Sequence, residues 1–400
     1  MRVAIFTDND FDKVNGVTTT LKAVLKHTDG RAQPRVITAG DERVETPEHF
    51  AASSIGLGLP WYRGMRVYLP RLRQFARELR RQGADVIHLT TPGPVGLAGR
   101  WLARELGLPM VGSYHTHLGE YVRTLGGSHR AGEGMDAYMR WFYGACTTVL
   151  APSRATERLL VSQGHRADRL RIWPRGVDTD EFSPLRASRE LRRQWRVDSR
   201  RPAIVYAGRL SAEKGLGHLP RIRQLLHRRA VEHQMVFAGD GPMAATLKRE
   251  IPDGIFLGAL PHHEVGRVMA SADVFLFPSP TDSFGNVVLE AQACGLPTIV
   301  TDRGGPCEQI LDNESGFICA ADDPDAFVEV LVPILRNEVR RRAMSGVARG
   351  WAEQHGWRQA LDPLVGAWRD ALESGATAGG SVVYASDALT TARPASAQPS

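Results

Sequence analysis

One stretch indicates both the fold and the chemistry of this chain. It reads Thr281-Asp-Ser-Phe-Gly-Asn-Val-Val-Leu-Glu290-Ala-Gln-Ala-Cys-Gly-Leu-Pro297, and it places two carboxylates, Asp282 and Glu290, eight positions apart around an apolar, helix-like run. A helix that begins near Phe284 would direct its free N–H groups at whatever lies beside Asp282. A phosphate fits there, and each carboxylate can accept hydrogen bonds from hydroxyl groups. The pattern is typical of a nucleotide-sugar site, but also of an Asp that caps a half-buried surface helix.

Outward from this stretch, short apolar runs alternate with segments of helix length. We predict strands over Val3–Thr7, Arg35–Ala39, Val86–Thr90, Met110–Tyr114, Thr148–Ala151 and Leu170–Pro174, and again over Ala203–Ala207, Gln234–Ala238, Ile255–Leu257, Val274–Phe277, Thr298–Thr301 and Phe317–Cys319. Continuous apolar strands between helices indicate parallel sheets that are covered on both faces. Two sets of six strands predict an α/β protein with two doubly wound, Rossmann-like domains.

The two predicted domains meet near Phe182-Ser-Pro184, just before an arginine-rich stretch. The first domain covers 1–180 and the second covers 181–353. Beyond Gly375 the composition is of low complexity, which predicts a disordered tail over 375–400.

Composition restricts the class of protein more than its function. The chain has 400 residues, of which 42% are hydrophobic and 24% charged, as in an ordinary globular protein of two domains. The net charge of +6 suits sugar nucleotides, nucleic acid or an anionic membrane surface equally well. The four cysteines form no C-x-x-C pair, so we expect neither disulfides nor a zinc site, and a cytoplasmic location. No signal peptide or membrane span is predicted, so we expect a soluble or peripheral protein.

Ligands of parallel sheets bind outside the carboxyl ends of the strands, and several motifs follow those ends. Gly16 opens a helix after the first strand and would let the backbone approach a phosphate, although the G-x-G-x-x-G fingerprint is absent. The first strand of the second half leads into Gly208-Arg209-Leu-Ser-Ala-Glu-Lys214-Gly215. An arginine fork and a lysine charge converging there would hold a diphosphate, although such side chains are more often solvated.

Two histidine pairs could suggest a metal. His115 and His117 would lie on the same side of a strand, as a metal pair needs, but no third ligand is evident. We expect sugar contact or loop packing there, and no metal. For His262 and His263 we expect a solvated helix start.

These segments, in this order, resemble the retaining glycosyltransferases of the GT-B fold usually called family 4. The motifs that carry the resemblance are Gly208-Arg-Leu-x-x-Glu-Lys-Gly215, Asp282 to Glu290 as an E-x7-E signature, Pro174-Arg-Gly-Val-Asp-Thr179, Asn15-Gly-Val17 and Thr91-Pro-Gly-Pro94. The resemblance covers roughly 1–370 and is strongest to the branch that decorates membrane lipids. It implies two domains that face each other across a cleft. It also implies that a helix over about 354–373 crosses back onto the N-terminal domain.

The resemblance implies roles for the positive residues and for the second carboxylate. Arg209 and Lys214 would bind the donor diphosphate, and Glu290 would accept hydrogen bonds from the ribose hydroxyls. Breaking a glycosyl–phosphate bond builds negative charge on the leaving diphosphate. Fixed cations there therefore stabilise the transition state more than the ground state. Because two cations can take the place of a metal ion, we expect no metal and no other cofactor.

The remaining roles concern the transferred sugar. Asp282, with the backbone at Phe284 and Gly285, would hold sugar hydroxyls, His115 would lie near the far side of the sugar, and Gly16 would approach the phosphates. The family usually has Glu at the first acidic position. Asp282 keeps the charge but reaches one methylene less far.

The sequence also predicts an acceptor surface. Residues 60–81 carry seven arginines against one glutamate, with aromatic residues between them. From Pro70, the residues Leu72, Phe75, Ala76 and Leu79 share one helix face, which is typical of a helix on an anionic bilayer. The alternative is an ordinary helix whose apolar stripe packs on the sheet while the arginines are solvated. No nucleic-acid module accompanies the segment.

We therefore expect a retaining hexosyltransferase, with α-mannosyltransferase as the specific candidate. It would move a sugar from GDP-mannose or a UDP-hexose to a membrane lipid or glycan. Three other classes of protein remain open. They are a sugar-nucleotide epimerase or phosphorylase on the same scaffold, a non-catalytic sugar-nucleotide-binding protein, and a nicotinamide-dependent oxidoreductase without its glycine fingerprint.

Overall fold

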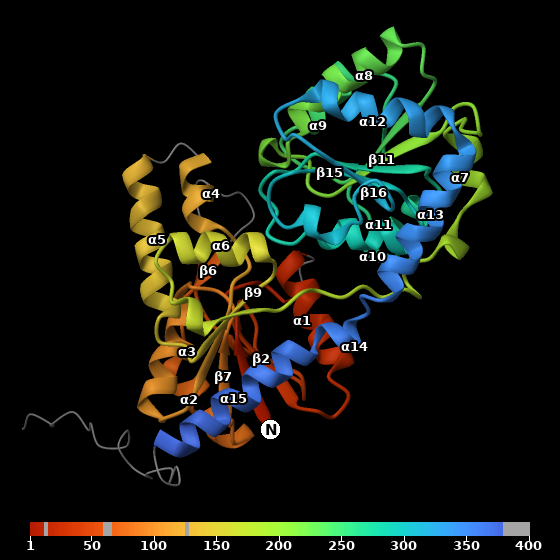
Figure 1. Ribbon diagram of the computed structural model, residues 1–400. Helices are drawn as coiled ribbons and strands as arrows, with labels where there is room; N and C mark the ends of the chain where they lie inside the picture. Colours follow the sequence, from red (N-terminus) through yellow and green to blue (C-terminus); the bar gives the residue numbers. More distant parts are fainter. Residues whose placement is uncertain (12–14, 59–65, 125–127, 379–400) are drawn as a thin grey trace, which may run out of the picture.

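The computed structural model describes residues 1–11, 15–58, 66–124 and 128–378 (Figure 1). Most of the predicted tail and residues 60–65 of the basic segment lie outside the described residues. Two domains are visible, with helix α1 (Gly16–His27) on the side of the N-terminal domain that faces the C-terminal domain (Figure 1). The predicted fold class of two doubly wound parallel-sheet domains is confirmed.

The N-terminal sheet has the strand order β10-β9-β8-β7-β1-β2-β4-β3, in which only the β3–β4 pair is antiparallel. Its strands are β1 (Arg2–Phe6), β2 (Gln33–Gly40), β3 (Val44–Glu45), β4 (His49–Ser53), β7 (Val86–Leu89), β8 (Met110–Ser113), β9 (Thr148–Ala151) and β10 (Leu170–Ile172). Strands β3 and β4, and the separate hairpin of β5 (Gly56–Gly58) and β6 (Arg66–Tyr68), are not predicted from sequence. They are short and poor in large apolar residues.

The helices of this domain are α1, α2 (Leu72–Gln82), α3 (Pro94–Glu105), α4 (Leu118–Thr124), α5 (His129–Tyr143) and α6 (Arg154–Ser162). The apolar stripe of α2 packs into the domain core, because Phe75, Ala76 and Leu79 are almost fully buried. The prediction that this stripe could lie on a bilayer is therefore wrong for Phe75, Ala76 and Leu79, which the core covers, whereas Leu72 at the start of the helix is exposed. The arginines of α2 remain on the surface.

The C-terminal sheet has six parallel strands, as predicted, and their order is β13-β12-β11-β14-β15-β16. They are β11 (Ala203–Ala207), β12 (Gln234–Ala238), β13 (Ile255–Phe256), β14 (Val274–Phe277), β15 (Thr298–Thr301) and β16 (Gly316–Cys319). The covering helices are α7 (Arg189–Gln194), α8 (Leu219–Arg228), α9 (Ala244–Glu250), α10 (His262–Ala270), α11 (Asn286–Ala293), α12 (Pro324–Arg336) and α13 (Glu338–Glu353). Fully buried Val, Ile, Leu and Phe side chains fill the space between the sheet and its helices.

The last two helices, α14 (Trp357–Ala360) and α15 (Asp362–Ala378), return to the N-terminal domain (Figure 1). Trp368 of α15 is fully buried in a cluster with residues of β1 and β7, and its indole N–H donates to His88 Nδ1 at 3.0 Å. Where the chain comes back, Val177 pairs with Gly356 in an isolated parallel bridge.

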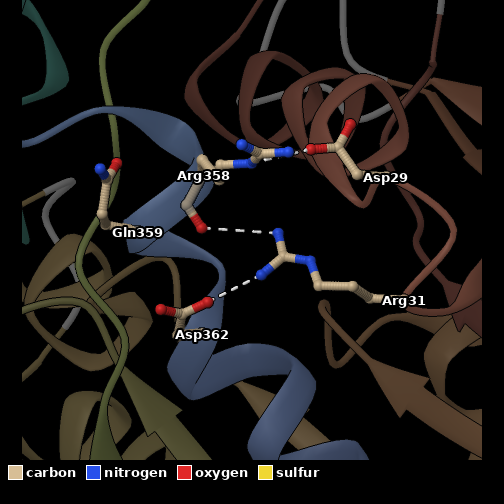
Figure 2. A pocket seen from close by; sticks show the side chains of 5 residues that line it. All are labelled: Asp29, Arg31, Arg358, Gln359 and Asp362. Atoms are coloured by element: carbon tan, nitrogen blue, oxygen red, sulfur yellow. Dashed lines mark hydrogen bonds and ion pairs between the residues drawn. The ribbon is translucent and has the colours of Figure 1, made fainter.

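Surface ion pairs hold this returning segment against the turn after α1 (Figure 2). The Arg31 guanidinium lies 2.7 Å from Asp362 and also donates to the carbonyl of Arg358, while Arg358 lies 3.3 Å from Asp29. These charged groups line a shallow hollow and form ion pairs with one another. The hollow is therefore part of the contact between the returning segment and the N-terminal domain. Among the described helices, none is both long and apolar enough to cross a bilayer.

Candidate functional site

The centre of the candidate site is an ion pair between two loops of the C-terminal domain. Lys214 Nζ lies 2.8 and 2.9 Å from the two carboxylate oxygens of Asp282, and each side chain is only 22% exposed. Gly215, with φ +69°, makes this approach possible, because a Cβ there would lie 2.0 Å from the carbonyl oxygen of Pro278. The loop after β11 therefore rests directly on the end of β14.

Further hydrogen bonds fix the same two loops. Thr281 Oγ1 donates to the carbonyl of Glu213 at 3.0 Å, and the hydroxyl of Tyr206 donates to the carbonyl of Arg209 at 3.0 Å. The side chain of Arg209 is exposed beside Lys214 in the sequence motif. The structure therefore places the predicted diphosphate loop at the carboxyl end of the sheet, next to the first predicted carboxylate.

Helix α11 begins with an N-terminus that no side chain caps. Its N-cap is Gly285, which has φ +85° and makes no side-chain hydrogen bond. Phe284 is buried in the domain core, so only its backbone faces the loop, and Gly305 N–H donates to the carbonyl of Asp282 at 2.8 Å. Among the described residues, no side chain thus caps the start of α11, which is the arrangement that binds anions.

Glu290, on the same helix, contacts a histidine that sequence reasoning placed in solvent. His262 Nε2 lies 3.2 Å from Glu290 Oε1, and His262 Nδ1 lies 3.0 Å from Glu181 Oε1. Burial lowers the pKa of His262, but the two carboxylates outweigh it and raise that pKa to about 9. The expectation of a solvated His262 is therefore wrong. No local pattern could reveal the contact, because Glu181 lies 81 residues away in the chain.

A cavity of about 280 Å³ lies between the two domains at this point. Its lining includes Thr18, Lys22, Lys26, Asp178, Glu181, His262, Asn286 and Glu290, from α1, the connecting segment, α10 and α11. Gly16 begins α1 and is exposed, while the next two N–H groups are bonded to the side chain of Asn15. The second predicted carboxylate therefore faces a space that both domains enclose.

His115 lies on the facing side, in a buried polar chain of the N-terminal domain. Its Nε2 lies 2.8 Å from Ser113 Oγ, which also lies 2.9 Å from His88 Nε2, and its Nδ1 lies 3.4 Å from Arg175. Burial and the charge of Arg175 hold the pKa of His115 well below its usual value, so the ring is neutral. Both ring nitrogens thus have partners within the domain, and the proposed contact with a sugar stays a prediction.

The neighbouring His117 differs from His115. Its Nδ1 is buried and has no hydrogen-bond partner among the residues that the structure describes. Burial lowers the pKa of His117, and the charge of Asp282 opposes that shift. Of the two histidines, His117 is therefore the one whose Nδ1 lacks a partner among the described residues and whose charge is influenced by Asp282.

Direct contacts join the two domains beside the site. Ser283 Oγ donates to the carbonyl of His115 at 3.1 Å, and Ser153 Oγ donates to the carbonyl of Ser283 at 2.7 Å. The Glu308 carboxylate accepts the backbone N–H groups of Arg154 and Ala155, at 2.8 and 2.6 Å, at the start of α6. Sequence reasoning missed Glu308, because its partners belong to the other domain.

Two family models match the chain, "Glycosyltransferase Family 4" over residues 14–181 and "Glycosyl transferases group 1" over residues 187–351. A GDP-mannose-dependent alpha-mannosyltransferase of Mycobacterium tuberculosis is 31% identical, with 92% of this chain and 96% of that protein covered. An alpha-monoglucosyldiacylglycerol synthase of Streptococcus pneumoniae is 27% identical over 76% and 72% of the two chains. Among solved structures, Anabaena HepE in complex with UDP gives a TM-score of 0.71 at 16% identity, covering 93% and 99%.

Proposed function

We propose a donor, a mechanism and an acceptor from one premise: the chain belongs to the glycosyltransferases of family 4 and group 1 and has the GT-B fold. The donor is a nucleotide sugar, with GDP-mannose first and a UDP-hexose second. The observation that carries this proposal is the uncapped N-terminus of α11, which lies between the Lys214–Asp282 pair and Glu290. Mannosyl transfer from GDP-mannose, the reaction named for the mycobacterial relative, supports the choice of donor.

The proposed reaction retains the configuration of the sugar. The acceptor hydroxyl attacks the anomeric carbon on the face that the diphosphate leaves. The carbon–phosphate oxygen bond breaks while the new glycosidic bond forms, and the proton of the acceptor passes to the leaving phosphate oxygen. Arg209 and Lys214 stabilise the developing negative charge. A double displacement would need a carboxylate at the reacting carbon, and the sequence offers no obvious nucleophile there.

No metal is part of this proposal. Lys214 already lies against a carboxylate that faces the site, and Arg209 follows the same strand. Binding of a diphosphate would supply a second anion to these cations. Two fixed positive side chains and the N–H groups of α11 provide the charge stabilisation that a divalent ion would otherwise give.

A donor panel tests the proposal. Thermal unfolding in the presence of GDP-mannose, UDP-glucose, ADP-glucose and NAD should show the largest upward shift with GDP-mannose and none with NAD. Product analysis with labelled GDP-mannose and lipid extract should then show a mannolipid. Stabilisation by a nucleotide sugar without any transfer to lipid or glycan would favour the non-catalytic binding protein. Conversion of the donor to another nucleotide sugar would favour the epimerase.

We further propose that the acceptor is a lipid held at an anionic bilayer. The diacylglycerol named in the pneumococcal relative supports this choice. Around the β5–β6 hairpin and the start of α2, four aliphatic side chains are exposed, namely Ile55 (63%), Leu57 (59%), Leu69 (50%) and Leu72 (39%). Arg73, Arg77 and Arg80 are exposed on α2 beside them. Aliphatic side chains next to several arginines suit the boundary between acyl chains and anionic headgroups.

Liposome co-sedimentation tests the membrane proposal. The protein should bind vesicles that contain anionic lipid but not neutral vesicles, and replacement of Arg73, Arg77 and Arg80 by Glu should abolish binding. A matched control replaces three exposed arginines of the other domain, Arg221, Arg228 and Arg249, by Glu. If both triple variants lose binding equally, the effect is one of net charge and the proposed surface is wrong.

A further inference from the structure

We propose that His262 is a positioning residue that orients Glu290 for the ribose hydroxyls of the donor and ties it to the segment joining the two domains. The inference rests on the proposed function, because it assumes a nucleotide at Glu290. None of the sequence motifs assigns this histidine a role. Its placement at the first position of α10 brings it to the cavity between the domains.

The geometry around His262 is that of a clamp between two carboxylates. Each ring nitrogen faces an acidic oxygen, Glu290 Oε1 at 3.2 Å and Glu181 Oε1 at 3.0 Å. The ring of Phe182 packs edge-on against the imidazole, with the centroids 4.9 Å apart. The imidazole is therefore fixed on three sides, and it in turn restricts the rotation of the Glu290 side chain.

The clamp leaves Glu290 able to bind a ligand. His262 contacts only Oε1, and Oε2 has no hydrogen-bond partner among the described residues. The Glu290 side chain is only 13% exposed, so few positions are open to a ligand at its second oxygen. A histidine that donates to one oxygen fixes the carboxylate and directs the other oxygen to the cavity, where it can accept hydrogen bonds from hydroxyl groups.

Further contacts continue from Glu181 to the N-terminal domain. The backbone N–H of Glu181 donates to Asp178 Oδ1 at 3.0 Å, and Lys26 of α1 lies 2.7 Å from Asp178 Oδ2. The carboxylate that would hold the ribose is thus linked, through His262 and the connecting segment, to a helix of the other domain. A change in the position of one domain would alter the clamp, and a bound nucleotide would stabilise it.

The charges around His262 favour its protonated form. Glu181 and Glu290 contact the ring, and Lys26, Lys22, His27 and Asp178 line the same cavity. With its pKa raised to about 9, His262 donates from both nitrogens below that pH. The pKa of His262 in the folded protein lies above the value of about 6.5 in the unfolded chain. The stabilisation that protonated His262 gives the folded state through its two carboxylate contacts is therefore complete below pH 6.5. It is lost as the pH rises through about 9.

Nucleotide affinity measures the clamp directly. We expect His262→Ala in the full chain to weaken binding of GDP, measured by calorimetry, about tenfold, and to raise KM for GDP-mannose by the same factor with less change in kcat. The matched control is His263→Ala, because His263 is 63% exposed and its ion-pair partner within the described part of the chain is its neighbour Glu264. If both variants bind GDP equally well, His262 does not position Glu290.

The pH profile separates a positioning role from a merely structural one. The wild-type affinity for GDP should fall as the pH rises through about 9, and His263→Ala should keep that fall. His262→Gln should restore part of the affinity lost in His262→Ala, because its amide can still donate to Glu290. Because the guanine ring of GDP itself loses a proton near pH 9, the profile of His262→Gln should fall less steeply than that of the wild type, and an equally steep fall in this variant would contradict the proposal. Absence of transfer with every donor, while GDP binding still depends on His262, would instead overturn the proposed function.

Discussion

The two domains differ in how they satisfy the helix N-termini that follow their strands. In the N-terminal domain, protein groups occupy these ends. The amide oxygen of Asn15 caps α1, and the carboxylate of Asp8 accepts the N–H groups of Gly93, Val95 and Gly96 at the start of α3. At α6, the cap is Ser153 together with the Glu308 carboxylate described above.

In the C-terminal domain, the helices that follow β11, β12, β13 and β14 are α8, α9, α10 and α11. None of these four N-termini has a side-chain cap among the described residues. An unsatisfied helix N-terminus attracts anions, whereas one that already holds a carboxylate does not. The helices after β11 to β14 thus leave their N-termini open to a phosphorylated ligand, whereas the described caps occupy α1, α3 and α6 and, after β16, Asp323 caps α12.

The largest expected effect concerns Lys214, the cation beside Asp282 in the C-terminal domain. Lys214→Ala should lower kcat/KM for the donor roughly 10- to 150-fold, because a charge-assisted contact to phosphate contributes about 1.5–3 kcal/mol. Steady-state kinetics with GDP-mannose measures this. The control is Lys248→Ala, which removes an exposed lysine of the same domain outside the site. Equal activity of both variants would mean that the loop after β11 does not hold the diphosphate.

The next effect concerns the occupied N-terminus of α3. Asp8→Ala removes a buried carboxylate that accepts three backbone N–H groups and the hydroxyl of Thr91. We expect the free energy of unfolding to fall by about 2–3 kcal/mol, because the freed N–H groups stay buried. Urea denaturation measures the loss. The affinity for GDP, measured where the variant is folded, should not change. A loss of GDP affinity would contradict the statement that the donor binds at the open N-termini of the C-terminal domain, since it would place the donor at α3.

The smallest effect concerns the cap that one domain provides for the other. Glu308→Gln keeps the length of the side chain but removes its charge from the N-terminus of α6. The cost should be about 0.5–1 kcal/mol, because the side chain is partly exposed and the amide oxygen can still accept one hydrogen bond. Thermal unfolding measures it. Small-angle scattering should show a larger radius of gyration if Glu308 also holds the domains together. An unchanged stability and radius would show that the contact carries no energy.

Sequence reasoning recovered the parts of this molecule that depend on local pattern. The strands of both sheets except β3 and β4 follow continuous apolar runs, and the loops of Lys214 and Asp282 follow strand ends, so the topology of parallel sheets places them together. Contacts between distant segments could not be predicted. The partners of His262, the cap of α3 by Asp8 and the burial of Phe75 depend on how elements pack, which no local spacing records.

The return of α15 to the N-terminal domain has a consequence for synthesis. The sheet of that domain is complete once residue 172 has been made, yet part of its core waits for Leu364, Trp368 and Ala371. Until then, the face of β7 and β8 against which α15 packs stays uncovered. The domain that leaves the ribosome first is therefore the one finished last. A nascent chain stalled before residue 360 should be recognised by chaperones, because this apolar surface is still exposed.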